Sequence, residues 1–277
     1  RTGNRRFRLF GNDDSENQEV FAMKFCSMIR IEKKKIKRSM IWVLLLLPVI
    51  LMWIPSVIHA DANFDTQGIL ITPENNFFIQ GFMGMAWFMI PATLIICTVL
   101  LNQTERRSRG ILKMLSLPIP PARLAMAKFV ILLFLSGVQM LMTVAAYYIS
   151  AGIASVMQDY NFLLSPFFVI KNVLTIYLAA IPMAAVFWMI SVWISSPIGS
   201  IALGLASLVP SVLIINMKIW FAYPMSYPFY LLMVQYGRAA EGMYETQIQW
   251  MPWIPVAAAV TVLALGLSCV GFGWKNK

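Results

Sequence analysis

The chain has 277 residues, of which 59% are hydrophobic and 12% charged, and its mean hydropathy is +0.71. Soluble domains average about 45–50% apolar and about 25% charged residues, so this composition excludes a soluble globular protein and indicates a polytopic membrane protein. The net charge of +10 lies almost entirely outside the apolar blocks. We therefore expect membrane lipids, and no nucleic acid, to be its partners.

The N-terminal residues 1–22 are polar and show no sustained helical periodicity, so we expect them to be disordered or a non-native extension. Met23 is a plausible natural start. Residues 23–277 are expected to form a single six-helix transmembrane domain, which leaves no room for a soluble catalytic domain.

A basic segment precedes the first apolar block. In it, Phe25, Met28 or Ile29, and Ile36 recur at helical spacing among Arg30 and several lysines. This pattern predicts a short amphipathic helix in the cytoplasmic interface, with its lysines toward acidic head groups. The alternative is that these lysines only set the orientation of the first span.

Six apolar blocks follow, each long enough to cross a membrane as a helix, so the predicted fold class is all-α. The fourth and fifth are separated only by Ser195-Ser196-Pro197, which predicts a tight helical hairpin. The blocks are Met40–Ala60, Phe78–Leu101, Phe129–Ala151, Phe167–Ser195, Ile198–Ile215 and Trp253–Trp274.

The first block also resembles a signal peptide, because Ala60 and Ala62 around Asp61 form an A-x-A pattern. Its apolar run is long for a signal sequence, and cleavage would leave an odd number of spans. We therefore expect this block to be retained as a span.

The distribution of basic residues predicts the orientation. Residues 1–39, 102–128 and 275–277 hold 11, 6 and 2 of the 22 lysines and arginines. An even number of spans puts both termini on one side, and the basic side of a membrane protein is the cytoplasmic one. Both termini are therefore expected in the cytoplasm.

Chemical motifs are scarce. The sequence has no G-x-x-x-x-G-K-[ST] loop and no H-E-x-x-H, and its one histidine, His59, lies at the outer end of the first block. Lys171 is the only charge inside a block. Because intramembrane enzymes and ion-coupled carriers need ionisable groups deep in the bilayer, we expect neither, and any transport must be energised by a separate subunit.

The connection between the second and third blocks, residues 102–128, is the longest basic break in the chain. Its apolar stripe from Ile111 to Leu117, ended by prolines, predicts a cytoplasmic amphipathic helix suited to docking on a soluble partner. The alternative is a loop whose basic residues only obey the positive-inside rule.

At this connection, Glu105-Arg106-Arg107 followed by Leu112-x-x-Leu115-Ser-Leu117-Pro118 resembles the permease subunits of ATP-binding-cassette (ABC) exporters, most closely the lantibiotic-immunity permeases. The basic segment before Trp42 and the aromatic and proline stretch from Trp220 to Pro228 are similar to the same family. Pro121 departs from the pattern, standing where a polar or basic residue is expected. The resemblance covers most of residues 23–277.

The resemblance implies a coupling helix that contacts two copies of an ATP-binding subunit, which would hold ATP and Mg²⁺, while this chain has no cofactor, metal or catalytic residue. It also implies a second permease chain, identical or homologous, in a bacterial cell membrane. The implied coupling residues are Glu105, Arg106, Arg107, Leu112, Leu115, Leu117, Pro118 and Arg123.

Residues 216–250 form the largest predicted outer segment and are rich in aromatic residues. Within it, residues 229–234 are expected to form a short re-entrant or interfacial helix. The segment is interpreted either as an ordinary interfacial belt or as a surface for an amphipathic cationic peptide. The candidate substrate residues are Trp220, Tyr223, Tyr227, Tyr230, Glu241 and Glu245.

The leading functional hypothesis is therefore the permease of an ABC exporter that removes a lantibiotic-like peptide or a similar amphipathic substrate from the membrane. The alternative is a non-transporting sensor or assembly factor that holds a cytosolic partner through its basic loop. A self-energised carrier ranks third because the spans lack deep charges.

Overall fold

A computed structural model describes most of the chain. The described residues are 27–30, 32–34, 40–66, 68–107, 120–240, 247–248 and 250–274, with only the backbone described for 103–107. Residues 1–22, for which disorder was expected, lie outside this range. Helices make up nearly all of the described chain and no strand occurs in it, which confirms the all-α fold class.

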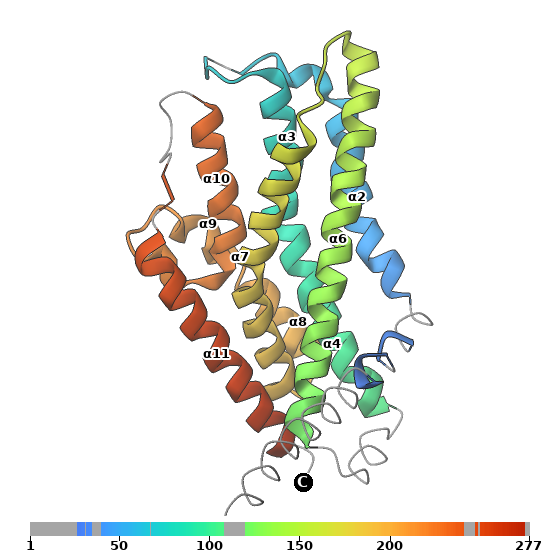
Figure 1. Cartoon of the computed structure of the whole chain (residues 1–277), viewed down its shortest axis with the longest axis vertical. Coiled ribbons are helices and arrows are strands. Elements are labelled where there is room, and N and C mark those ends of the chain that lie inside the picture. The colour runs from blue at the N-terminus through green and yellow to red at the C-terminus, as the bar shows by residue number, and fades with distance from the viewer. Residues whose placement is uncertain are drawn as a thin grey trace, which may run out of the picture.

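The longer helices run up and down a single bundle (Figure 1). We call the end where α4 (Ile90–Arg107) stops and α6 (Pro121–Gln158) starts the basal end, and the opposite end the apical end. Six helical stretches in the described residues are long and apolar enough to cross a membrane, which confirms the predicted number of spans. They are Ile41–Ile58, Pro73–Asn102, Pro121–Gln158, Pro166–Trp193, Pro197–Ile214 and Trp250–Trp274.

Proline marks the first turn of several helices, where its missing N–H costs no hydrogen bond. Pro121, for example, begins α6. The third span therefore starts eight residues before the predicted Phe129, and the prolines that were expected to end the coupling helix also begin the next one. The same device starts α3 (Pro73–Gly84), α7 (Pro166–Trp193), α8 (Pro197–Ala206), α9 (Val209–Ile214) and α10 (Tyr227–Ala239).

The fifth span is not the continuous helix that was predicted for Ile198–Ile215. It breaks between α8 and α9 at Ser207 and Leu208. Pro210 explains the break, because it has no N–H to donate to the Ala206 carbonyl in the preceding turn. The serine hydroxyl donates to the carbonyl of Gly204 at 2.6 Å, which satisfies one acceptor at the end of α8.

The second span contains a π-helical turn, η2 (Met85–Met89), between α3 and α4. Pro91 follows it directly, and a proline ring would clash with the carbonyl four residues earlier in a regular α-helix. Widening the turn relieves that clash. The Thr93 hydroxyl donates to the Met89 carbonyl at 2.7 Å, and Gln139 of α6 donates to the same hydroxyl at 3.0 Å.

Helices α4, α6 and α7 form the middle of the bundle, while α2 (Ile41–Ile58), α8 and α11 (Trp250–Trp274) lie at its periphery. The predicted first span, α2, packs against α6 and α3. It buries Leu45, Val49 and Trp53, as an integral span does.

Aromatic side chains fill the space between α2, α3 and α6. Trp53 of α2 lies 5.5 Å from Phe82 and 6.0 Å from Phe77 of α3, measured between ring centroids. Its centroid lies 5.6 Å from that of Tyr147 of α6. Gly81 of α3 faces the Trp53 indole, and its lack of a side chain is what allows the ring to sit there.

Candidate functional site

The residues that flank the predicted coupling segment lie at the basal end. Glu105, Arg106 and Arg107 fall in the last turns of α4, where only the backbone is described. Arg123 lies in the first turn of α6. The four remaining coupling residues, Leu112, Leu115, Leu117 and Pro118, lie outside the described residues, so their role stays a prediction.

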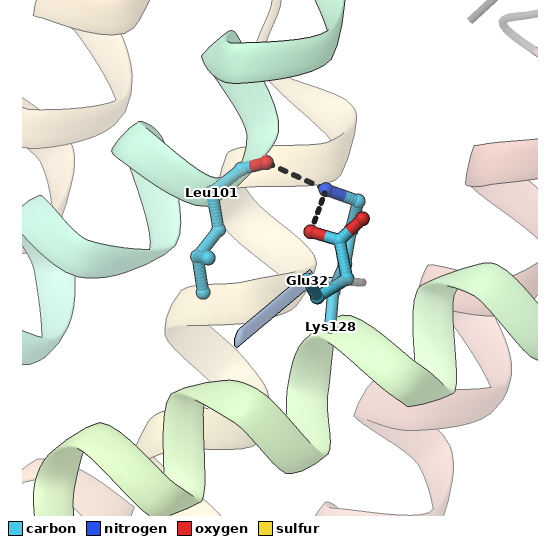
Figure 2. A network of polar contacts seen from close by, with 3 residues as sticks. All are labelled: Glu32, Leu101 and Lys128. Carbon is cyan, nitrogen blue, oxygen red and sulfur yellow. Dashed lines mark hydrogen bonds and ion pairs between the residues drawn. The ribbon is translucent and has the colours of Figure 1, made fainter. Parts of the chain in front are cut away.

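A buried ion pair joins three elements beside these helix ends (Figure 2). Nζ of Lys128, on α6, lies 3.6 Å from Oε2 of Glu32. Glu32 belongs to the N-terminal helical residues, 27–30 and 32–34. The same Nζ donates a hydrogen bond of 2.8 Å to the carbonyl oxygen of Leu101 on α4. We call Glu32, Lys128 and the Leu101 carbonyl the basal clasp.

Both charged side chains of the basal clasp are removed from solvent. Lys128 is 0% exposed and Glu32 is 3% exposed. An unpaired charge in such a position is very costly, and the two side chains compensate each other's charge. The clasp thus fixes the N-terminal helical residues to the facing ends of α4 and α6, the two helices that residues 108–119 connect.

The sequence interpretation put Lys128 at the end of the basic connection, in a helix with Arg123 and just before the block that starts at Phe129. In the structure Lys128 lies two turns inside α6. A signal for this was present: Leu124, Leu132 and Leu135 stand at helical spacing from Lys128, and all are buried on the same face.

The N-terminal helical residues have the amphipathic character that the sequence predicted. Met28 and Glu32 are buried, whereas Arg30, Lys33 and Lys34 are exposed. The Lys33 ammonium lies 4.4 Å from the centroid of the Phe134 ring on α6, a cation–π contact. The other predicted apolar positions, Phe25 and Ile36, lie outside the described residues. The acidic residue on the buried face was not foreseen.

The predicted substrate aromatics pack against one another inside the molecule. Trp220 and Tyr230 stack with ring centroids 3.6 Å apart, and Tyr227 and Trp253 complete the group, which we call the aromatic cluster. Tyr223, nearby, is partly buried and donates a hydrogen bond to the Ser207 carbonyl. In this conformation the buried members of the cluster offer almost no contact area to a peptide.

The position of α10 explains this burial. Figure 1 shows that α10 runs from about half the height of the bundle toward the apical end. It contacts α3 and α7. The expected re-entrant or interfacial run, residues 229–234, lies within this helix. Glu241 and Glu245 lie outside the described residues, so substrate contacts of this segment stay a prediction.

Across the described residues, no three His, Cys, Asp or Glu side chains come together in a way that could hold a metal ion. The polar features of the bundle are instead the basal clasp and hydrogen bonds such as that from Asn102 of α4 to the Ser191 carbonyl of α7, at 2.5 Å.

Comparison with protein families decides what kind of membrane protein this is. The model of the ABC-2 family transporter proteins matches residues 28–211, about two thirds of the chain. The chain belongs to the ABC-2 transporter family. No curated protein and no solved structure gives a significant match.

Membership of the ABC-2 family means that this chain is a membrane subunit of an ABC transporter, and that a separate ATP-binding subunit hydrolyses ATP. The matched range runs from the N-terminal helical residues to the first residues of α9 and includes every residue of the basal clasp. It ends before the aromatic cluster.

Proposed function

We propose that this ABC-2 subunit is the permease of an exporter that removes a lantibiotic-like antimicrobial peptide, or a similar amphipathic substrate, from a bacterial cell membrane. It acts with two copies of an ATP-binding subunit, which hold ATP and Mg²⁺, and with a second permease chain, identical or homologous. The permease itself cuts no bond in the substrate.

The observation that carries this proposal is the arrangement at the basal end. The basal clasp fixes the end of α4 to the start of α6. The Lys128 Nζ on α6 donates a hydrogen bond of 2.8 Å to the Leu101 carbonyl oxygen on α4. Residues 108–119 start and finish there, and they hold the apolar stripe with Leu112, Leu115 and Leu117. A segment mounted on two fixed helices can transmit the movement of an ATPase to the spans.

The charge distribution supports a cytoplasmic basal end. Residues 1–39 and 102–128 are strongly basic, and the described parts of both lie at the basal end. The ATP-binding subunits of such a transporter work in the cytoplasm, where ATP is available, so this orientation places the predicted coupling segment on their side.

The coupling role is tested by replacing Leu115. When the full chain is co-expressed with an ABC ATPase encoded beside it and purified in detergent, the ATPase is expected to co-purify. We expect Leu115→Asp to lose most of that ATPase, because a charge in an apolar docking stripe must be desolvated. Gel densitometry and ATP hydrolysis of the eluate provide the two measurements.

Leu70→Asp is the matched control, since Leu70 is 70% exposed and lies toward the apical end, far from the basal clasp along α2 and α3. It should retain the ATPase. If no ATPase co-purifies with the wild-type chain, or if both variants retain it equally, the proposed coupling role is wrong. The basic residues of the connection would then only set the orientation of the spans.

The substrate is tested in cells. Deleting the gene is expected to lower the concentration of a cationic lantibiotic that stops growth, because peptide would accumulate in the outer leaflet. Restoring the wild-type permease gene should restore resistance. It should not do so in cells whose ATPase partner lacks its catalytic residues. Unchanged sensitivity across several amphipathic peptides would contradict the peptide substrate and leave the permease function intact.

A further inference from the structure

A cavity opens near the apical end, away from the basal clasp and the aromatic cluster. Its volume is about 460 Å³, within the usual range of small-ligand sites. The wall is built from the end of α2, the turn η1 (Ala60–Asn63) with the residues after it, the start of α3, and Tyr236 of α10. We call this cavity the apical pocket.

Two buried amide side chains belong to the base of the apical pocket. Asn63 is 6% exposed and Asn76 is 8% exposed, and the rings of Phe77 and Tyr236 are buried as well. These four residues form a base that packing holds in place. The exposed lining residues form the rim, and they are Pro55, His59, Ala62, Asp65 and Gln80.

The amides of Asn76 and Gln80 act as a pair. They stand four residues apart on α3, on one face of the helix, and Gln80 Nε2 donates to Asn76 Oδ1 at 3.4 Å. Whichever way round the two amides lie, this bond uses one proton of one amino group and one carbonyl oxygen. The pair therefore offers a ligand both a donor, from one amide, and an acceptor, from the other.

Three further side chains of the pocket accept hydrogen bonds. Ser56 Oγ donates its proton to the Met52 carbonyl at 2.9 Å, and Thr66 Oγ1 donates to the Ile69 carbonyl at 2.7 Å. Each hydroxyl oxygen keeps a lone pair for a ligand. Asn63 Nδ2 donates to the Ala60 carbonyl at 3.0 Å, which leaves its Oδ1 as an acceptor.

The lining offers a ligand little charge. The described residues that line the pocket include no lysine or arginine, so none of them supplies a cation for a phosphate group. Asp65 already interacts with another group of the chain, so we assign it no ligand. His59 is formally neutral at pH 7, and a neutral imidazole has one donor and one acceptor. The pocket thus suits an uncharged ligand that both donates and accepts hydrogen bonds.

The position of the pocket indicates where this ligand comes from. Ser56 lies in the last turn of the first span, and Asn76 and Gln80 lie in the first turns of the second. The ends of two spans lie at the level of the lipid head groups. Polar side chains at this level are costly to leave against hydrocarbon, but they match the polar head group of a lipid.

We propose that the apical pocket binds the uncharged sugar head group of a glycolipid in the leaflet at the apical end. Each hydroxyl of a sugar donates one hydrogen bond and accepts others, so neighbouring hydroxyls can meet the amide pair and the acceptors of the wall together. The C–H groups of the sugar ring contact the apolar part of the wall, including Pro55 and Ile69. A bound head group bridges the end of α2 and the start of α3. The inference goes beyond the proposed function and does not rest on it.

Native mass spectrometry of the full chain tests the site. The chain is titrated, in separate experiments, with glucosyl diacylglycerol, galactosyl diacylglycerol, diacylglycerol and phosphatidylglycerol, all with the same acyl chains. We expect at least one glycolipid to bind about tenfold more tightly than diacylglycerol, because the sugar adds two or more hydrogen bonds. Equal binding of all four lipids, or tighter binding of phosphatidylglycerol than of both glycolipids, overturns the proposal.

Matched variants locate the binding. Asn76→Leu and Gln80→Met nearly keep the size of the side chain, and each is expected to weaken glycolipid binding about fivefold through the lost amide. Asn75→Leu is the control, because the Asn75 amide donates to Thr72 Oγ1 at 2.9 Å and does not line the pocket. It should bind as the wild type does. Equal binding by all three variants overturns the site.

Thermal unfolding shows whether each variant is folded. Asn76 is buried, so its replacement carries the greater risk to the fold. Gln80 is exposed on the rim, and Gln80→Met therefore tests the site even where Asn76→Leu unfolds.

Soluble competitors distinguish the possible sources of the ligand. The methyl glycoside of the bound sugar is expected to displace the glycolipid, and no displacement would mean that the acyl chains hold the lipid and overturn the sugar site. If a methyl glycoside binds but neither glycolipid does, the ligand is a free sugar and the head-group assignment is wrong. If N-acetylasparagine amide displaces the glycolipid as well as the glycoside does, the pocket recognises peptide amides and the sugar proposal is overturned.

These measurements contain neither an ATPase nor an exported peptide. A missing ATPase partner, or unchanged sensitivity of cells to peptides, would therefore contradict the proposed function without changing the result for the apical pocket.

Discussion

Replacing Lys128 with methionine is expected to destabilise the chain by roughly 3–5 kcal/mol, because the buried Glu32 carboxylate would lose its compensating charge. The Leu101 carbonyl would lose its hydrogen-bond donor as well. Methionine has nearly the length of lysine, so the change removes the charge while leaving little empty space. Thermal unfolding of the purified full chain in nanodiscs measures the loss.

Hydrogen exchange distinguishes local unfolding of the N-terminal helical residues from destabilisation of the whole bundle. Glu32 belongs to the short N-terminal helical residues, which can leave the bundle more easily than a span can. Hydrogen exchange at residues 27–34 is therefore expected to rise sharply in Lys128→Met. Unchanged exchange there, together with a lowered unfolding temperature, would mean that the destabilisation arises elsewhere in α6.

The double variant Glu32→Gln/Lys128→Met removes both charges and is expected to recover much of the lost stability, since no ion is then left buried alone. Lys171→Met is the control, because Lys171 is an exposed lysine on α7. If Lys128→Met unfolds at the same temperature as Lys171→Met, the ion pair contributes nothing to the fold and cannot fix the ends of α4 and α6.

The basal clasp also shows where sequence interpretation stops. The six spans could be predicted because burial in hydrocarbon depends on the composition of one stretch at a time. The burial of Lys128 against Glu32 could not be predicted, because a buried lysine is acceptable only when a particular acidic residue from another segment meets it. Glu32 looked like one charge among many in a basic stretch, and nothing local pairs it with α6.

The packing of the aromatic segment likewise depends on other parts of the chain. Residues 216–250 are too interrupted to form a span, so they were interpreted as an outer surface. The burial of Trp220, Tyr227 and Tyr230 depends on how α10 packs against α3 and α7, which a pattern of aromatic residues does not reveal. Likewise the break at Ser207 has a local cause in Pro210, whereas the stacking of Trp220 on Tyr230 has none.

Gly81→Ala is expected to destabilise the chain by about 1–3 kcal/mol, through overpacking. A Cβ at this position would lie 2.5 Å from Cζ3 and 2.6 Å from Cη2 of the Trp53 ring, closer than carbon atoms can approach. The ring has little freedom to move, because Trp53 is 2% exposed and packs against Phe77, Phe82 and Tyr147. Helix propensity alone predicts the opposite sign, a gain of up to about 1 kcal/mol.

Two further variants make the sign of this effect decisive. Gly266→Ala, in α11, places a Cβ where no atom lies within 4 Å, so it should leave the unfolding temperature unchanged or raise it slightly. Trp53→Phe in the Gly81→Ala background shortens the ring and is expected to restore part of the stability. The indole Nε1 makes no hydrogen bond to any described residue, so phenylalanine removes bulk without leaving an acceptor unpaired. If Gly81→Ala and Gly266→Ala behaved alike, α2 and α3 would not be in close contact at the Trp53 ring.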